Sequence, residues 1–286
     1  MAGVDFGPRA TKELLRQYGV IAKKQLGQNF LIDARVLDGI VAAVNADDHT
    51  VALEVGPGLG ALTTQLAERA RQVVAIEKDE TLRPLLGGVL AGQGNVELVF
   101  ADCLKVDIEA LVSPFLQEDD DLVFAANLPY YVTTPILFAV LESKLPLRRA
   151  VVMVQREVAD RMVAAPGGKD YGVLSVGVQY RGAVQRLFVV PPSAFLPQPG
   201  VESAVVLIDC EHRPPLRAPD EETFFQVVRA AFSTRRKTLE NALAGGLGIA
   251  KLEAADLIQR AGLNPSARAE ALSIEDFVRL AEQMGP

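Results

Sequence analysis

Cysteine is scarce in this 286-residue chain, which contains only two. Cys103 and Cys210 are far apart and lack the close spacing of metal ligands, so we predict ordinary thiols and no metal site. A disulfide scaffold is excluded, because such folds need several cysteines in a short chain. We therefore expect a protein of the reducing cytoplasm.

Long apolar runs are also missing. No stretch approaches the roughly 18–20 residues that a transmembrane helix requires, and the first residues lack the apolar core of a signal peptide. We expect neither membrane association nor export. The 23 glycines and 17 prolines show no period, which excludes collagen, and a hydrophobic content of 49% excludes disorder. What remains is a globular protein of one large or two smaller domains.

Five short β-branched runs alternate with stretches of helical period in the first half of the chain. The predicted strands are residues 51–55, 73–76, 96–100, 121–126 and 150–154, and the predicted helices are 61–70, 81–90 and 134–141. Strands that alternate with helices pair in parallel through right-handed crossovers. The pattern predicts a doubly wound α/β sheet that binds its ligand at the carboxyl ends of the strands.

The pattern changes after residue 172. The sequence pattern predicts strands over 173–180, 185–190 and 203–209. We expect these strands to form an antiparallel edge on the same sheet. A proline-rich linker at 211–219 follows, and beyond it four segments have helical period, namely 221–232, 235–244, 251–261 and 274–283. The expected domains are an α/β domain over 1–212 and a small all-helical domain over 213–286.

A glycine-rich turn, Glu54-Val-Gly56-Pro-Gly58-Leu-Gly60-Ala61, lies between a predicted strand and a predicted helix. Glycines there allow the backbone to approach a ligand, and the helix N-terminus offers free amide donors. The turn by itself also fits a dinucleotide-binding enzyme, which stays open as an alternative. In either case Glu77, at the end of the second strand, suits the hydroxyls of a ribose.

Two further features favour a different cofactor. Asp102 follows the third strand, where its carboxylate suits the exocyclic amine of an adenine. Asn127-Leu-Pro-Tyr130 ends the fourth strand, and a hydride-transfer enzyme has no obvious need for this tetrapeptide. Polar or glycine-rich features thus end four successive strands, which predicts one cofactor site along that edge.

The tetrapeptide suits chemistry on an aromatic amine, whose lone pair is delocalised into its ring. Hydrogen bonds from both amine hydrogens to the Asn127 side-chain oxygen and the Leu128 carbonyl would favour a pyramidal, nucleophilic nitrogen. Pro129 fixes the turn, and Tyr130 is placed to stack on the base. Phe195, in a proline-rich loop, is the candidate for the other face.

With these motifs in this order, the chain resembles the bacterial 16S ribosomal RNA adenine N6,N6-dimethyltransferases, the kasugamycin-resistance dimethyltransferase family, over nearly its whole length. The resemblance rests on Lys24-Gln-Leu-Gly-Gln-Asn-Phe-Leu31, Glu54-Val-Gly-Pro-Gly-Leu-Gly-Ala-Leu-Thr63, Ala75-Ile-Glu77, Asn127-Leu-Pro-Tyr130, Gln155-Arg-Glu-Val-Ala-Asp-Arg161, Tyr171-Gly-Val-Leu-Ser-Val176, Phe195-Leu-Pro-Gln-Pro199 and Arg235-Arg-Lys-Thr-Leu-Glu-Asn241.

The resemblance implies a Rossmann-like class I methyltransferase sheet, with residues 1–50 as an N-terminal extension over the cofactor site. It further implies S-adenosylmethionine as cofactor, S-adenosylhomocysteine as product, and dimethylation of two adjacent adenosines near the 3′ end of 16S rRNA in the immature small subunit. The implied partner is the 30S subunit or its precursor, with no obligate protein partner and a monomeric enzyme. The implied cofactor residues are Asn29, Leu31, Gly56, Glu77, Asp102 and Asn127, and the implied catalytic residues are Asn127, Leu128, Tyr130 and Phe195.

Two related classes share the scaffold. The 23S rRNA methyltransferases of macrolide resistance are the main alternative, although they typically carry isoleucine where this chain has Leu128. The mitochondrial transcription-factor relatives are a non-enzymatic alternative, against which the complete set of cofactor motifs argues. Tyr131 departs from the small polar residue that usually follows the tetrapeptide, and we expect it to affect how the target base enters.

The net charge of −7 argues against a protein that coats nucleic acid non-specifically, but charge is uneven along the chain. Residues 1–30 carry a net +3, including Lys23 and Lys24, and a basic run, Arg235-Arg236-Lys237, opens the helix predicted over 235–244. RNA phosphates require such local patches. We therefore predict RNA contacts at these five side chains, with the helical domain supplying affinity for the RNA backbone.

Overall fold

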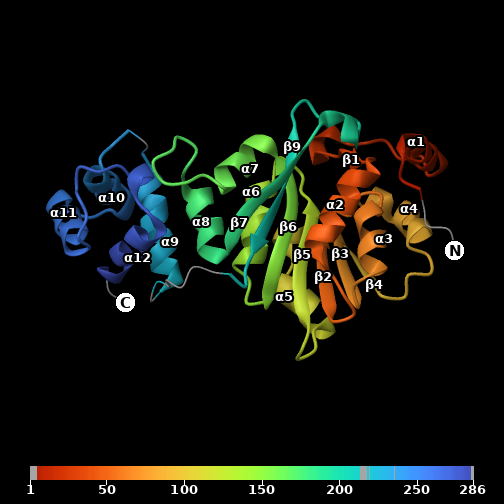
Figure 1. Cartoon of the computed structure of the whole chain (residues 1–286), viewed down its shortest axis with the longest axis horizontal. Coiled ribbons are helices and arrows are strands. Elements are labelled where there is room, and N and C mark those ends of the chain that lie inside the picture. The colour runs from red at the N-terminus through yellow and green to blue at the C-terminus, as the bar shows by residue number, and fades with distance from the viewer. Residues whose placement is uncertain (1–4, 213–217, 219, 235, 285–286) are drawn as a thin grey trace. The chain divides into compact units, whose positions relative to one another are not determined.

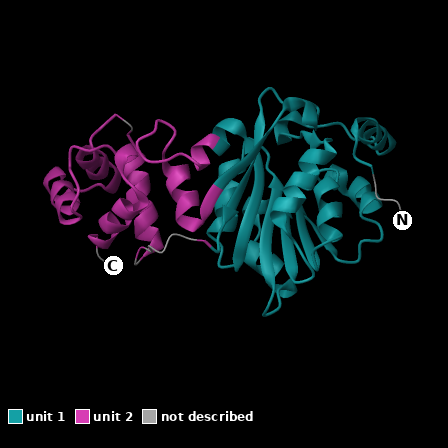
Figure 2. Cartoon of the chain, in the orientation of Figure 1, with its two compact units in different colours: residues 1–159, 185–211 teal, residues 160–184, 212–286 magenta. Residues whose placement is uncertain are grey.

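The computed structural model describes residues 5–212, 218, 220–234 and 236–284. The chain forms two compact units, one of residues 1–159 and 185–211 and the other of residues 160–184 and 212–286 (Figure 2). The second unit begins close to the expected boundary at 212, but it also takes in residues 160–184, which the sequence pattern assigns to the α/β domain. No helix among the described residues has both the length and the apolar character needed to cross a membrane.

Unit 1 is built on a seven-stranded sheet of order β4-β3-β2-β5-β6-β9-β7 (Figure 1). The strands are β2 (Thr50–Val55), β3 (Gln72–Glu77), β4 (Val96–Phe100), β5 (Asp121–Asn127), β6 (Leu147–Gln155), β7 (Ala183–Val190) and β9 (Ser203–Asp209). β2 to β6 pair in parallel, while β9 runs antiparallel to β6. This confirms the mostly parallel sheet with an antiparallel edge.

The strand order reverses at β2, which lies between β3 and β5. The chain passes outward from β2 through β3 to β4 and then returns to β5 on the other side of β2. Ligands of such sheets bind in the crevice that this reversal opens at the carboxyl ends of the strands. The topology therefore places a site beside the ends of β2 and β5.

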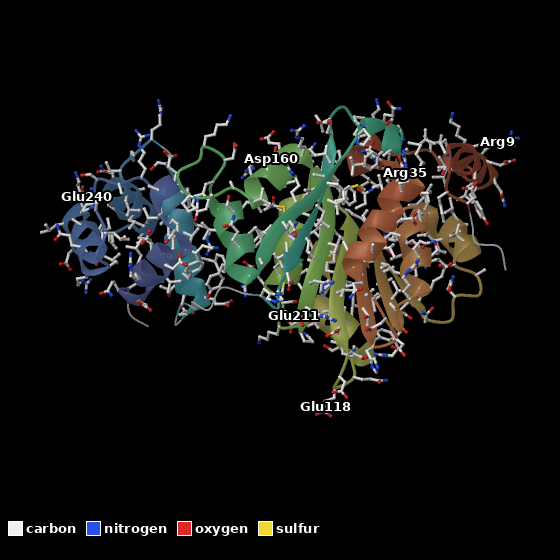
Figure 3. The ribbon with its side chains drawn as sticks, viewed as in Figure 1. Arg9, Arg35, Glu118, Asp160, Glu211 and Glu240 are labelled. Atoms are coloured by element: carbon white, nitrogen blue, oxygen red, sulfur yellow. The ribbon has the colours of Figure 1, made fainter. Side chains whose placement is uncertain are left out.

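Helices cover the sheet, and its central strands β2, β5 and β6 are mostly buried. The helices of unit 1 are α2 (Ala34–Val44), α3 (Ala61–Ala67), α4 (Arg83–Val89), α5 (Ile108–Val112), α6 (Thr133–Leu141) and α7 (Arg156–Met162). Helix α7 continues into unit 2. Short 3-10 turns lie at η2 (Glu80–Leu82), η3 (Cys103–Lys105), η4 (Ser113–Phe115) and η5 (Pro192–Ala194). Helices α2 and α3 share one apolar cluster with sheet residues such as Val123 and Val151. Charged side chains such as Arg9, Arg35 and Glu118 point away from this core (Figure 3).

The N-terminal segment comprises α1 (Pro8–Gln17), η1 (Lys24–Leu26) and β1 (Phe30–Leu31). Helix α1 and the residue after it pack against an apolar cluster that includes Leu85 and Leu86 of α4, through Leu14, Leu15 and Tyr18. β1 pairs antiparallel with β8 (Phe195–Leu196), which places Phe30 opposite Leu196 and Leu31 opposite Phe195. These contacts hold the segment on unit 1.

The strand expected over 173–180 is wrong, because these residues form helix α8 (Val173–Arg181). Most of the helix is buried, so its sequence lacks the polar face that gives a surface helix its period. Ser175 stabilises its first turn, since its Oγ accepts from the Gly172 amide at 3.1 Å and donates to the Arg161 carbonyl at 2.6 Å. Tyr180 stacks on Phe224 with ring centroids 4.3 Å apart. Tertiary burial overrides the strand preference of the β-branched residues.

Unit 2 consists of helices around its own core. Besides α8 it contains α9 (Glu221–Phe232), α10 (Leu239–Leu247), α11 (Lys251–Arg260), η6 (Ala269–Ala271) and α12 (Ile274–Glu282). Asp220 caps α9 by accepting from the amides of Glu222 and Thr223 at 3.2 and 2.9 Å. Fully buried side chains such as Phe224 and Phe277 form the core. The predicted small helical domain is thus present.

Candidate active site

A cavity opens at the carboxyl ends of the central strands of unit 1. It is lined mainly by residues 26–31, 54–59, 76–78, 101–104 and 127–132. All six predicted cofactor residues, Asn29, Leu31, Gly56, Glu77, Asp102 and Asn127, line it, together with Leu128 and Tyr130. The structure therefore brings together residues that are up to 101 positions apart in the chain, the separation of Asn29 and Tyr130.

The glycine turn forms the wall next to β2. The φ angles of Gly56, Gly58 and Gly60 are 75°, 59° and 85°, in a region of backbone conformation that residues with a side chain rarely adopt. A Cβ on Gly60 would also lie 3.2 Å from Val89 Cγ1, so glycine allows α3 to begin against α4. The Gly56 and Gly60 amides donate to the Ile76 and Pro57 carbonyls, both at 2.9 Å. The turn is thus held by backbone hydrogen bonds, and Gly56 and Gly58 line the cavity without side chains in the way.

Glu77 ends β3 and is only 6% exposed. Its carboxylate accepts from the Gly58 amide at 3.1 Å and from the Asp79 amide at 2.8 Å, so it joins the glycine turn to the next loop. Burial raises the pKa of Glu77, while these amides act in the opposite direction. The residue is held rigidly with its carboxylate at the cavity wall.

Glu54 has no role in the predicted site, yet it lines the cavity and is 1% exposed. Its Oε2 makes no hydrogen bond within the described residues. The neighbouring Thr63 hydroxyl is near enough to lower the pKa of Glu54. Burial raises the pKa of Glu54 to about 8. One acidic residue within the otherwise apolar strand 51–55 was the available signal. A buried acceptor without a partner, at the wall of a cavity, suits a ligand that brings a hydrogen-bond donor.

The Asn127 side chain is oriented by the N-terminal segment. Its Nδ2 donates to the Asn29 carbonyl at 3.2 Å, while Asn29 Nδ2 donates to the Gly27 carbonyl at 3.1 Å. Because a carbonyl only accepts, the Asn127 amide must turn its nitrogen to Asn29, which leaves Oδ1 as the acceptor for a ligand. This is the orientation that binding an amine hydrogen requires.

The turn after Asn127 is held by its backbone. The Leu128 amide donates to the Met153 carbonyl at 3.1 Å, and the Pro129 carbonyl accepts from the Val132 amide at 3.1 Å and from Thr133 Oγ1 at 3.0 Å. Tyr130 is partly buried, and its hydroxyl lies 2.6 Å from Ser203 Oγ on β9. Burial raises the pKa of Tyr130, so the phenol is neutral. The ring is anchored at its hydroxyl end while it lines the cavity.

Phe195 does not join this group. It is 1% exposed, is absent from the cavity lining and packs in the apolar cluster under α2. Pairing of β8 with β1 turns the ring into the core. In this structure the ring is therefore not available to stack on a base, contrary to the expectation.

Asp102 caps η3 and pairs with a lysine. Its Oδ1 accepts from the Leu104 amide at 3.2 Å, and its Oδ2 lies 3.1 Å from Lys78 Nζ. The Lys78 ammonium holds the pKa of Asp102 below its usual range, and Asp102 in turn raises the pKa of Lys78. Asp102 is therefore a charged acceptor at the cavity, as its predicted role requires, while Lys78 is a neighbour that the sequence pattern did not reveal.

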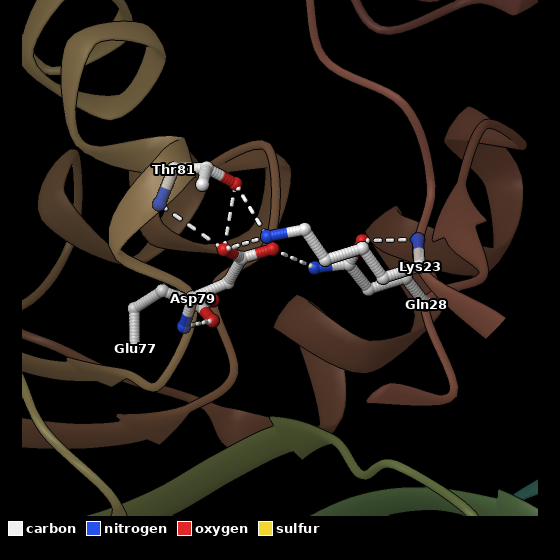
Figure 4. A network of polar contacts seen from close by, with 5 residues as sticks. All are labelled: Lys23, Gln28, Glu77, Asp79 and Thr81. Carbon is white, nitrogen blue, oxygen red and sulfur yellow. Dashed lines mark hydrogen bonds and ion pairs between the residues drawn. The ribbon is translucent and has the colours of Figure 1, made fainter. Parts of the chain in front are cut away.

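Lys23 has an internal partner rather than a free surface position. Its Nζ donates to Asp79 Oδ1 at 2.6 Å and to Thr81 Oγ1 at 2.9 Å, and Gln28 Nε2 donates to Asp79 Oδ2 at 2.7 Å (Figure 4). Burial of Asp79 is outweighed by these hydrogen bonds, which lower its pKa to about 2. The network ties the N-terminal segment to the loop after Glu77. This placement argues against the RNA contact predicted for Lys23.

The other predicted RNA contacts fall in two places. Lys24 is exposed on η1. Arg236 and Lys237 are exposed in the turn before α10, and Arg235 lies outside the described residues. Helix α10 begins at Leu239 rather than at residue 235, so the basic run precedes the helix instead of opening it.

The chain is similar to known proteins over most of its length. Residues 20–285 match the family described as ribosomal RNA adenine dimethylase. The chain is 47% identical over 283 residues to the ribosomal RNA small subunit methyltransferase A of Geobacillus thermodenitrificans, covering 98% of this chain and 96% of the relative. It is also 47% identical over 280 residues to the protein of that name from Bacillus cereus, covering 97% and 96%.

Two solved structures are similar in fold. A dimethyladenosine transferase from Plasmodium falciparum has a TM-score of 0.71 and 24% identity, covering 88% of this chain and 95% of that one. The 23S rRNA methyltransferase ErmE has a TM-score of 0.65 and 26% identity, covering 90% and 100%. The family match spans residues 20–285, and the 47% identity extends over nearly the whole chain. The chain belongs to the ribosomal RNA adenine dimethylase family.

Proposed function

We propose that this chain is an S-adenosylmethionine-dependent enzyme that dimethylates N6 of two adjacent adenosines near the 3′ end of 16S rRNA in the immature small subunit. Family membership and the names of the 47% identical relatives support this proposal. The observation that carries it is the Asn127 amide, whose oxygen is left as an acceptor beside a cavity wall made by Gly56 and Glu77.

The cavity fits the proposed cofactor. Glu77 offers a fixed carboxylate for the ribose hydroxyls, and Asp102 offers a charged acceptor for the adenine amine. Glu54 Oε2 is a buried oxygen that lacks a partner among the described residues, so it is available to a hydrogen-bond donor of the ligand. Asn29 and Leu31 close the cavity from the N-terminal segment. When bound, the cofactor supplies a methyl group on a positively charged sulfur and leaves as S-adenosylhomocysteine.

The target adenine is proposed to enter beside Asn127. Its N6 hydrogens are accepted by Asn127 Oδ1 and the Leu128 carbonyl, which localises the nitrogen lone pair for an in-line attack on the methyl carbon. Tyr130, held by Ser203, stacks on the base. Positioning supplies most of the acceleration, and the methylated nitrogen loses its proton to water. Phe195 has no part in this arrangement.

The RNA itself is proposed to contact exposed cations. Lys24 lies on η1, whose Leu26 lines the cavity together with Gly27. Arg236 and Lys237 lie in unit 2, to which we assign affinity for the RNA backbone. If Arg236→Ala and Lys237→Ala together left RNA affinity unchanged across a salt titration, this division of labour would be wrong.

The test of the reaction uses labelled S-adenosylmethionine and undermethylated 30S particles, followed by nucleoside analysis. Dimethyladenosine in 16S rRNA is expected. Label in 23S rRNA would instead favour the macrolide-resistance activity, and absence of label from both RNAs would overturn the proposal.

A further inference from the structure

Tyr131 is a large aromatic side chain left open at the cavity mouth. It follows Tyr130 in the turn between β5 and α6, lines the cavity and is 54% exposed. Tyr130, in contrast, is partly buried and anchored through its hydroxyl. Two consecutive aromatic residues therefore differ in environment, one within the cavity and one at its rim. The proposed function uses only the first.

The N-terminal segment holds the Tyr131 ring in place. A Cβ built on Gly27 would lie 3.4 Å from Tyr131 Cδ1 and 3.7 Å from Pro129 Cβ, so the ring lies against the backbone of Gly27. Gly27 ends η1, which carries the exposed Lys24. The ring thus has one side against the N-terminal segment and another side open to a ligand.

The lysine in the cavity lining is paired with a carboxylate. Lys78 lines the same cavity, but its Nζ is paired with Asp102 Oδ2 at 3.1 Å. The rim therefore offers a ligand mainly an aromatic surface rather than a strong positive charge. An aromatic surface of this kind suits a nucleobase, because every base has a π face.

An adenine that leaves its RNA strand to enter the cavity also leaves its neighbours partly unstacked. We propose that Tyr131 stacks on the base of a nucleotide adjacent to the target adenosine and so holds the RNA while the target base is flipped out. This rests on the proposed function, since it requires an RNA substrate at this cavity. Tyr131 is then a positioning residue whose ring takes the place of the flipped base as a stacking partner for its neighbour.

The first experiment measures methylation of undermethylated 30S particles by Tyr131→Ala and Tyr131→Phe. A stacked base contributes about 1–3 kcal/mol, so Tyr131→Ala should lower kcat/KM by about 5- to 150-fold, mostly through KM. Tyr131→Phe should stay within about twofold, because stacking does not need the hydroxyl. Ile21→Ala, at a side chain 83% exposed on the N-terminal segment, is the matched control and should change nothing.

Affinity for S-adenosylmethionine separates stacking from a merely structural role. Since Tyr131 contacts Gly27 in the segment that closes the cavity, a structural role would weaken cofactor binding in Tyr131→Ala. We expect cofactor affinity and melting temperature to match the wild type. A loss of cofactor affinity as large as the loss in kcat/KM would overturn the proposal.

The decisive test is a double-mutant cycle with RNA oligonucleotides that carry an abasic site on either side of the target adenosine. For one neighbour, the abasic site and Tyr131→Ala should each weaken binding at least about fivefold, with no further loss when combined. The loss should persist at high salt, unlike that of a phosphate contact. Additive losses for both neighbours would overturn the proposal. Wild-type enzyme that forms no dimethyladenosine would overturn the proposed function instead.

Discussion

Replacing Glu54 by glutamine should change how the stability of the ligand-free protein depends on pH. Burial raises the pKa of Glu54 to about 8 from an ordinary value of 4.5, the negative charge of Glu77 acts in the same direction, and the Thr63 hydroxyl opposes it. The folded protein therefore retains a proton that the unfolded chain releases. The corresponding stability is fully present below pH 4.5 and is lost as the pH rises toward 8.

The magnitude follows from the two pKa values. A tenfold difference in proton affinity between the folded and unfolded states corresponds to about 1.36 kcal/mol, so stability should fall by on the order of 3 kcal/mol between pH 5 and pH 8 through this group alone. Glutamine has nearly the same shape but does not titrate. The free energy of unfolding of Glu54→Gln, relative to that of the wild type, should therefore increase by the same amount between pH 5 and pH 8.

Urea unfolding followed by circular dichroism at four pH values measures this difference. Comparing the two proteins at each pH cancels the titration of the other groups. Glu97→Gln, on an exposed side chain of β4, is the matched control and should give a constant difference. If Glu54→Gln also gave a constant difference from pH 5 to pH 8, the carboxyl would not be the buried, unpartnered group described above.

Three further predictions concern single side chains. Asn127→Ala should abolish methyl transfer in the labelled-cofactor assay while RNA affinity changes only a few-fold; joint loss of both would indicate a structural role. Lys23→Ala removes the partner of Asp79 and should lower the free energy of unfolding by about 1–2 kcal/mol. Lys24→Ala should leave stability unchanged and reduce the salt slope of RNA binding by about 1. The reverse pattern would contradict a structural role for Lys23 and an RNA contact at Lys24. Gly60→Ala requires a side chain at φ 85° and 3.2 Å from Val89 Cγ1, so it should destabilise the protein by at least about 1–2 kcal/mol in thermal unfolding; an unchanged melting temperature would refute the steric account.

Much of the sheet was predictable because its central strands are mostly buried and form short apolar, β-branched runs between turns. The mostly buried β9 has the bounds predicted for it, 203–209, and the partly exposed β4 has those predicted, 96–100, because its run is also rich in β-branched and aromatic residues. Helix α9 was predicted with its observed bounds, since it has one polar and one buried face. The same criterion failed for α8, because a helix that is buried on most sides has no polar face to reveal its period.

Contacts between distant segments were the least predictable part of the site. Lys23 and Phe195 have ordinary sequence surroundings, but Lys23 pairs with Asp79 and Phe195 is turned into the core by the pairing of β8 with β1. Glu54 was visible as an acid in an apolar strand, but only the structure shows that its Oε2 lacks a partner among the described residues at the cavity wall.

By itself the sequence determined which residues end each strand, since apolar runs and turn residues act over a few positions. It thereby determined the glycine turn after β2 and the Asn127 turn after β5. The tertiary structure decided that these two turns face one cavity, because β5 returns to the side of β2 away from β3. It also decided that Asn29, 98 residues earlier in the chain, orients the Asn127 amide. Such a contact depends on how the whole chain packs, which no local spacing encodes.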